Sequence, residues 1–72
     1  MSLYTLINYC LAKKGKVIED LAKEAGTTKF TTIKKIYEIE KGKITPTGKR
    51  VIEALKKYCP KDGLIKRIKA RS

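Results

Sequence analysis

The stretch from residue 21 to residue 42 limits the possible folds of this chain more than any other part. An apolar stripe runs from Leu21 to Ala25 and stops at Gly26, and glycine is the residue that most often ends a helix in left-handed geometry. Thr27 and Thr28 follow, and a threonine hydroxyl suits the N-cap of a further helix. After them, apolar residues recur at helical spacing up to the next glycine: Ile33, Ile36, Tyr37 and Ile39. The stretch predicts two helices joined by a tight turn.

Two helices joined in this way have two interpretations. In a helix-turn-helix, small residues let the helices approach, glycine forms the corner, and isoleucines anchor the second helix while its other face enters a DNA major groove. The alternative is a helical hairpin that only packs within a core. The stretch alone leaves both open.

The charge of the whole chain narrows the class of partner. Eighteen lysine and arginine residues against seven acidic residues give a net charge of +11 and an isoelectric point near 9.9. Such an excess indicates a polyanionic partner. Nucleic acid is the first candidate and an anionic membrane surface the second. A chain of 72 residues has room for one small domain.

Membrane, secreted and enzymatic roles find little support in the sequence. No segment is long and apolar enough to span a bilayer, and the positive charges follow the first apolar run, whereas a secretory signal carries them before it. The chain contains no histidine, no cysteine beside a base and no glycine-rich phosphate loop. We therefore expect a cytoplasmic protein that is not an enzyme, with no membrane partner, cofactor, metal or small-molecule ligand.

The two cysteines are far apart in the sequence and match no metal-binding spacing. They are Cys10 and Cys59. In a cytoplasmic protein they are expected to be reduced thiols that pack as small hydrophobes in the core.

Periodicity and capping signals predict an all-α domain of four to five helices. The expected helices cover about 3–14, 17–25, 29–41 and 46–59, and Thr45 and Pro46 mark the start of the fourth. Pro60 ends that helix, and Asp62 is a possible cap for a short last one. The chain is thus read as a single domain, 1–72, with a helical core over 1–59 and a basic helix or tail over 60–72.

The run from Gly15 to Tyr58 resembles the lambda-repressor-like, XRE-type helix-turn-helix domains, which include phage repressors and Cro proteins. The resemblance lies in the ordered set Gly15, Leu21-Ala22, Ala25-Gly26-Thr27, Ile36, Ile39-Glu40, Gly42-Lys43, Pro46 and the apolar face of Val51, Ile52, Leu55 and Tyr58. It implies sequence-specific binding of double-stranded DNA by a small transcriptional regulator that acts as a homodimer.

The chain departs from this family at two points. The spacing from Gly26 to Ile36 is about four residues, or one helical turn, longer than usual, so either the recognition helix or its turn is longer. Ile18 stands where relatives often carry a phosphate-binding glutamine. The first departure leaves open which residues of the third helix face the groove.

Candidate contact residues follow from their chemistry and position. Lysine can bond guanine, threonine can bond a base or touch a thymine methyl, and phenylalanine can pack on that methyl. The base-reading candidates are Lys29, Phe30, Thr31, Thr32, Lys34 and Lys35. The phosphate-binding candidates, near the turn and the start of the fourth helix, are Thr27, Thr28, Lys43, Thr45, Thr47, Lys49 and Arg50.

For several residues a structural role competes with DNA contact. Phe30 is expected to plug the core beneath a longer turn more readily than to touch a base. Lys34 and Lys35 can belong to a solvated face. Glu40 is expected to be structural, with Leu11 replacing the arginine with which an acid at this point in the family commonly pairs.

Other functions remain open on the sequence. RNA binding would use the same charge, although the few aromatic residues form no evident stacking pair. A protein-interaction or antitoxin-type module would use the same fold. In the tail, Leu64, Ile65 and Ile68 share one side of a helix, which covers either the domain's own core or a second subunit.

Overall fold

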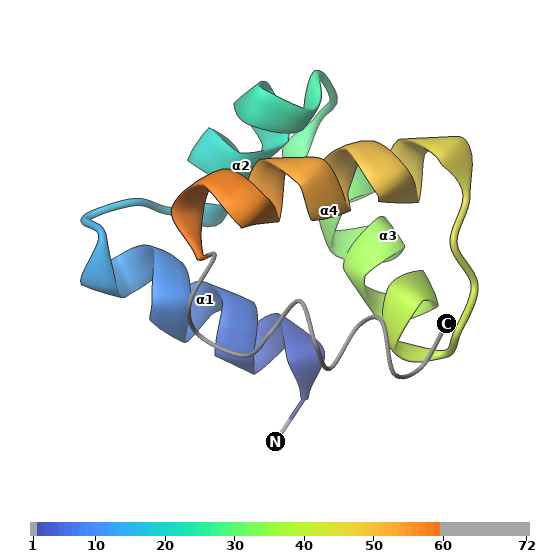
Figure 1. The fold of residues 1–72 in the computed structure, drawn as a ribbon, viewed down its shortest axis with the longest axis horizontal. Helices are drawn as coiled ribbons and strands as arrows, with labels where there is room; N and C mark the ends of the chain where they lie inside the picture. The colour runs from blue at the N-terminus through green and yellow to red at the C-terminus, as the bar shows by residue number, and fades with distance from the viewer. Residues whose placement is uncertain (1, 60–72) are drawn as a thin grey trace.

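The computed structural model describes residues 2–59, which form four α-helices and no β-strand (Figure 1). The all-α class is therefore confirmed, and each helix end lies within two residues of its expected position. The short helix predicted after Asp62 and the possible role of the tail lie outside the described residues. The helices are α1 (Leu3–Lys13), α2 (Ile18–Ala25), α3 (Lys29–Glu40) and α4 (Pro46–Tyr58).

Glycine ends α2 as the sequence predicts. Gly26 adopts left-handed geometry, with φ 73° and ψ 33°. Its N–H donates to the carbonyl of Lys23 at 3.1 Å, and the N–H of Thr27 donates to the carbonyl of Ala22 at 3.0 Å. This pair of hydrogen bonds satisfies carbonyls that the end of a helix would otherwise leave without partners. The chain is thereby turned sharply from α2 towards α3.

Side-chain oxygens cap the starts of α2, α3 and α4. The hydroxyl of Thr28 accepts the N–H of Thr31, and the hydroxyl of Thr45 accepts the N–H of Gly48, both at 3.1 Å. At α2 the N-cap is Val17, whose side chain cannot accept a hydrogen bond. Instead the carboxylate of Asp20 accepts the Val17 N–H at 2.9 Å. Asp20 thus provides one half of a capping box, because it accepts the N–H of the N-cap residue, while Val17 has no side-chain oxygen to accept an N–H of the first turn.

The four helices enclose one apolar core. In Figure 1, α4 crosses the middle of the molecule, α2 lies above it, α1 below it, and α3 descends at its right-hand end. The largest fully buried apolar side chains come from all four helices: Leu3, Ile7, Leu11, Leu21, Ile36, Ile39, Val51 and Leu55. Tyr37, which belongs to the same apolar series in the sequence as the isoleucines, is 45% exposed. The core-facing residues of α3 are therefore the isoleucines and Thr32.

Cys10 of α1 and Cys59 at the end of α4 form a disulfide, so the expectation of two reduced thiols was wrong. Their Cα atoms are 6.3 Å apart although 49 positions separate them in the chain. Both residues are buried, as expected. Spacing along the chain carries no information on the distance in space between a residue of one helix and the end of another, so the sequence could not reveal this pairing.

Glu40 joins the end of α3 to the start of α1. Its Oε2 accepts the backbone N–H of Leu3 at 2.7 Å. A carboxylate at a helix N-terminus is favoured both by this hydrogen bond and by the helix dipole. The expected structural role of Glu40 is confirmed. Its carboxylate binds the N-terminal end of α1.

None of the described helices meets the length and hydrophobicity that a membrane crossing requires.

Candidate nucleic-acid interface

The α2–α3 pair has a short connection. Three residues, 26–28, separate the two helices. Two small residues of α2, Ala22 and Ala25, are buried. A turn of three to four residues is usual in helix-turn-helix motifs. Because the connection has only three residues, most of the stretch from Gly26 to Ile36 lies in α3, which has 12 residues.

The outward face of α3 carries alternating aromatic and basic side chains. Phe30, Lys34, Tyr37 and Lys41 follow the spacing i, i+4, i+7, i+11 and are all exposed. At about 100° per residue they fall within an arc of about 60°, so they form a single stripe. We call these four residues the α3 outer stripe. The opposite face packs into the core through Thr32, Ile36 and Ile39.

Phe30 is the most exposed large apolar side chain among residues 2–59, at 82%. The expectation that it plugs the core was wrong. It stands in the first turn of α3, after the Thr28 cap, and lies outside both the core cluster and the apolar residues packed against it. The ring is therefore free to meet a partner.

The remaining base-reading candidates differ in whether their side chains are exposed and unused by contacts within the protein. Lys34 is exposed and is in none of the ion pairs formed within residues 2–59. Lys29 is exposed but lies 3.9 Å from Glu19 of α2. The hydroxyl of Thr31 lies 3.0 Å from that of Thr28 and belongs to the cap of α3. Lys34 is thus the most available of the basic candidates.

Lys35 is turned towards the body of the protein. Its ammonium donates to the carboxylate of Glu38 at 3.1 Å, and both side chains are less than a fifth exposed. This hydrogen bond holds the pKa of Glu38 below its usual range, against an opposing effect of burial. The charges of Lys35, Lys43 and Lys34 lower that pKa further. Lys35 therefore serves an internal ion pair, while Lys34 and Lys43 add positive charge around it.

Thr32 is fully buried, so its assignment as a base-reading residue was wrong. The helical period places it beside Ile36 on the core face of α3. Its hydroxyl oxygen has no hydrogen-bond partner among the described residues.

Thr32→Val is expected to raise the free energy of unfolding by about 1 kcal/mol, because a buried hydroxyl without a partner costs stability and valine has nearly the same shape. Chemical denaturation of both proteins measures the difference. A destabilised variant would mean that the hydroxyl has a partner in solution.

The phosphate candidates gather around the turn and the start of α4. Lys43, Lys49 and Arg50 are exposed, whereas Thr45 and Thr47 are partly buried. The hydroxyls of Thr28 and Thr45 already serve as helix caps, and the N–H of Thr27 is used at the end of α2. The available phosphate donors are therefore the three basic side chains, beside the N-terminus of α4, whose first turn contains no acid.

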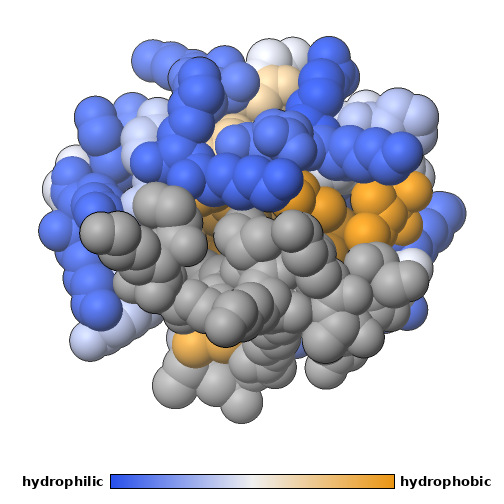
Figure 2. Space-filling view, viewed as in Figure 1, coloured by the Kyte–Doolittle hydropathy of each residue, from blue (hydrophilic) through white to orange (hydrophobic). Residues whose placement is uncertain are grey.

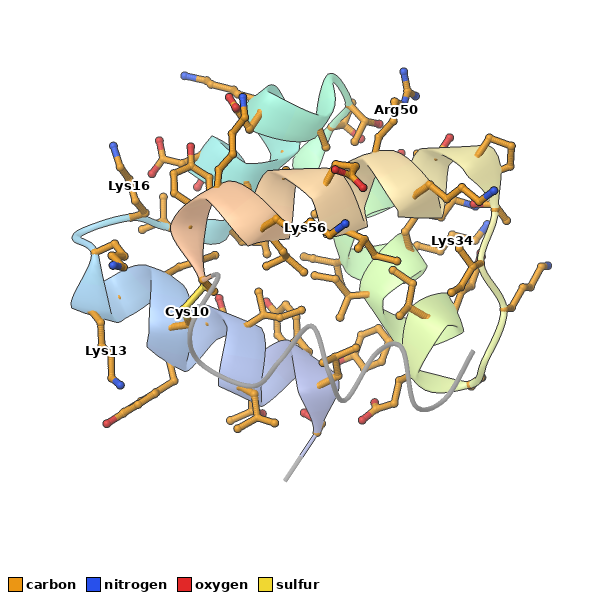
Figure 3. All side chains as sticks on the ribbon, in the orientation of Figure 1. Cys10, Lys13, Lys16, Lys34, Arg50 and Lys56 are labelled. Carbon is orange, nitrogen blue, oxygen red and sulfur yellow. A yellow bond between two sulfur atoms is a disulfide. The ribbon has the colours of Figure 1, made fainter. Side chains whose placement is uncertain are left out.

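Four of the labelled basic side chains lie at two ends of the molecule, whereas Lys56 lies between them on α4 (Figure 3). In the view of Figure 3, Lys34 and Arg50 extend from the right-hand end, around the start of α4. Lys13 and Lys16 lie at the opposite end, beside the connection between α1 and α2. Only the first of these groups adjoins α3.

Tyr37 and Lys41 were missed among the candidate contact residues. Tyr37 packs one side of its ring against Tyr4 of α1, with ring centroids 5.7 Å apart, and leaves the rest exposed. The sequence contains a signal that would have identified both residues, because they continue the spacing of Phe30 and Lys34 along α3. Tyrosine also suits a buried position, because its ring is largely apolar, so its residue type alone does not indicate an exposed contact.

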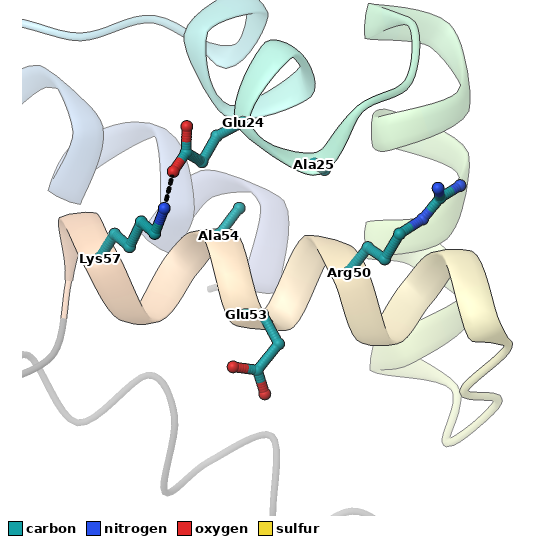
Figure 4. A pocket seen from close by; sticks show the side chains of 6 residues that line it. All are labelled: Glu24, Ala25, Arg50, Glu53, Ala54 and Lys57. Atoms are coloured by element: carbon teal, nitrogen blue, oxygen red, sulfur yellow. Dashed lines mark hydrogen bonds and ion pairs between the residues drawn. The ribbon is translucent and has the colours of Figure 1, made fainter.

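A shallow hollow between α2 and α4 offers no comparable chemistry. It is lined by Glu24, Ala25, Arg50, Glu53, Ala54 and Lys57 (Figure 4). Lys57 donates a hydrogen bond to Glu24, which raises the pKa of Lys57. The charges are mixed, and no group of acidic or cysteine side chains among residues 2–59 could hold a metal ion. Figure 2 shows hydrophilic side chains over α2 and α4 on this face.

Comparisons of the chain with protein families, with curated proteins and with solved structures found no match.

Proposed function

We propose that this protein binds double-stranded DNA in a sequence-specific manner, as a small transcriptional regulator of the Cro or repressor type. The observation that carries the proposal is the α3 outer stripe. A helix held to the core by one face exposes aromatic and basic side chains along the other, directly after a three-residue turn. A second helix presented in this way suits the width of the major groove. The net charge of +11 suits the phosphates that flank it.

The contacts divide into two groups. Lys29, Phe30 and Lys34, on the first half of α3, would face base edges. Lys43, Lys49 and Arg50 would bind phosphates and set the position of α3 in the groove, since phosphate contacts position a protein and base contacts specify the sequence. No chemical step is involved, and regulation would come from occupying a site that other proteins need.

A homodimer is part of the proposal. One α3 reaches only a few base pairs, which is too few to define a site in a genome. Two copies on a two-fold symmetric site would read twice as many and double the number of phosphate contacts.

A protein that binds DNA has to be in the compartment that contains DNA, which indicates the cytoplasm. The disulfide further requires that this compartment does not reduce it. Reducing cytosols keep most thiols reduced, but the intracellular proteins of hyperthermophiles are often rich in disulfides. We therefore propose a cytoplasm, or a comparable compartment with DNA, in which the buried Cys10–Cys59 bond persists.

Single substitutions separate the two groups of contacts. Lys34→Ala is expected to lower the ratio of affinities between a selected site and an unrelated duplex by about 5- to 150-fold, because a good base contact contributes about 1–3 kcal/mol of discrimination. Lys49→Ala is expected to weaken both duplexes alike. Both can be measured by fluorescence anisotropy, with a site selected from random duplexes.

Lys13→Ala is the matched control, because Lys13 is an exposed lysine at the opposite end of the molecule. Lys13→Ala should leave the ratio of affinities between the selected site and the unrelated duplex unchanged. Equal changes in the ratio for Lys34→Ala and Lys49→Ala would contradict the division of contacts.

A protein-interaction or antitoxin-type module is the second candidate. The exposed rings of Phe30 and Tyr37 favour it, since aromatic side chains are enriched at protein interfaces. The alternation of these rings with lysines favours a polyanion instead.

A further inference from the structure

The exposed ring of Phe30 calls for an apolar partner. The side chain is 82% exposed and lies outside the core and outside the apolar residues packed against it. Burial of a phenylalanine is normally favourable, so its exposure leaves that gain to be realised on binding. Lys34 lies one turn further along the same stripe. Its ammonium group takes part in none of the ion pairs among residues 2–59.

The major groove contains one apolar group that such a ring can touch. Among the four bases only thymine presents a methyl group there, whereas guanine presents the two acceptors that suit a lysine ammonium. The combination of Phe30 and Lys34 on one stripe therefore matches a thymine and a guanine that lie near each other in one groove.

The helix geometry sets the spacing of these two bases. Four residues advance about 6 Å along a helix axis, and successive base pairs are about 3.4 Å apart. Contacts from Phe30 and Lys34 would therefore fall about two base pairs apart along the groove.

We propose that Phe30 is a specificity-determining residue that reads the thymine C5-methyl group, about two base pairs from a guanine read by Lys34. This rests on the proposed binding of duplex DNA by α3 and adds which bases the protein prefers. Phe30 acts by burying the methyl group and makes no hydrogen bond.

The test removes the methyl group and leaves the base pair intact. A duplex selected from a random library is prepared in two forms, one with thymine and one with uracil at every thymine position. Wild-type protein is expected to bind the uracil form about three- to fivefold more weakly for each methyl group that it reads, which corresponds to the burial of one methyl-sized group. Phe30→Ala is expected to bind both forms equally.

Tyr9→Ala is the matched control, because Tyr9 is also an exposed aromatic residue, at 64%, but lies on α1. It should keep the wild-type preference for thymine. Since Phe30 is outside the core, Phe30→Ala should melt within a few degrees of wild type, and thermal unfolding verifies that the variant is folded.

Three outcomes would overturn the assignment. Equal binding of both forms by wild-type protein, with duplex binding intact, refutes methyl reading by Phe30 and leaves the proposed function standing. A preference for thymine that survives Phe30→Ala refutes the role of this residue in the same way. Absence of duplex binding altogether refutes the proposed function and the inference together.

Discussion

Replacing both Cys10 and Cys59 with alanine is expected to lower the free energy of unfolding by about 4 kcal/mol. A disulfide that closes a loop of 49 residues restricts the unfolded chain, and the loss of chain entropy predicts an effect of this size. The total stability of a 72-residue domain is about 4–11 kcal/mol, so the double variant would be marginally stable. Guanidinium unfolding followed by circular dichroism measures the change.

Wild-type protein that has been unfolded and fully reduced should behave as the double variant does. The bond also links α1 to the end of α4, whereas the packing of α1 is mainly against α3. A loss below about 1 kcal/mol would mean that the unfolded chain is already restricted, or that the thiols are not joined in solution.

The affinity for duplex DNA is expected to fall about a thousandfold between 50 mM and 200 mM salt. Each phosphate contact from a basic side chain releases a condensed counterion and contributes about −0.9 to the slope of log affinity against log salt. Lys43, Lys49 and Arg50 thus give about −2.7 for one protomer and about −5.4 for a homodimer. Anisotropy titrations at several salt concentrations measure the slope.

Two variants make the salt experiment specific. Lys49→Ala should reduce the magnitude of the slope by about 2 in a homodimer, one contact for each protomer. Lys13→Ala, at the far end of the molecule, should leave the slope unchanged. A slope near zero would exclude phosphate binding by these residues, and a slope near −2.7 would indicate a monomer on DNA.

Local signals predicted the helices well. Glycines and threonines stand where helices end and begin, and the hydrogen bonds at Gly26, Thr28 and Thr45 depend only on neighbouring residues. For that reason the boundaries of α2, α3 and α4 could be read without any knowledge of the tertiary structure. At α2, where the N-cap residue is Val17, the hydrogen bond from the Val17 N–H to Asp20 likewise joins neighbouring residues.

Contacts between distant parts of the chain could not be predicted in this way. The pairing of Cys10 with Cys59 depends on how α1 and α4 meet in space. The burial of Thr32 and the exposure of Phe30 depend on the rotation of α3 about its axis, which the four-residue length difference left open. A strict helical period anchored on Ile36 and Ile39 would have placed Thr32 inside and Tyr37 outside. The position of a residue around the helix axis, and not its apolar or polar character, thus decides which of these side chains is buried.

The central claim is that α3 enters the groove of a duplex, and direct binding tests it best. The affinity of the 72-residue chain should be measured for a duplex selected from random sequences and for single-stranded RNA of matching sequence, at about 150 mM salt. We expect the selected duplex to bind at least 100-fold more tightly, because specific readout adds about 4–10 kcal/mol to the attraction of any polyanion. Equal affinity for the two, or tighter binding of the RNA, would contradict the account.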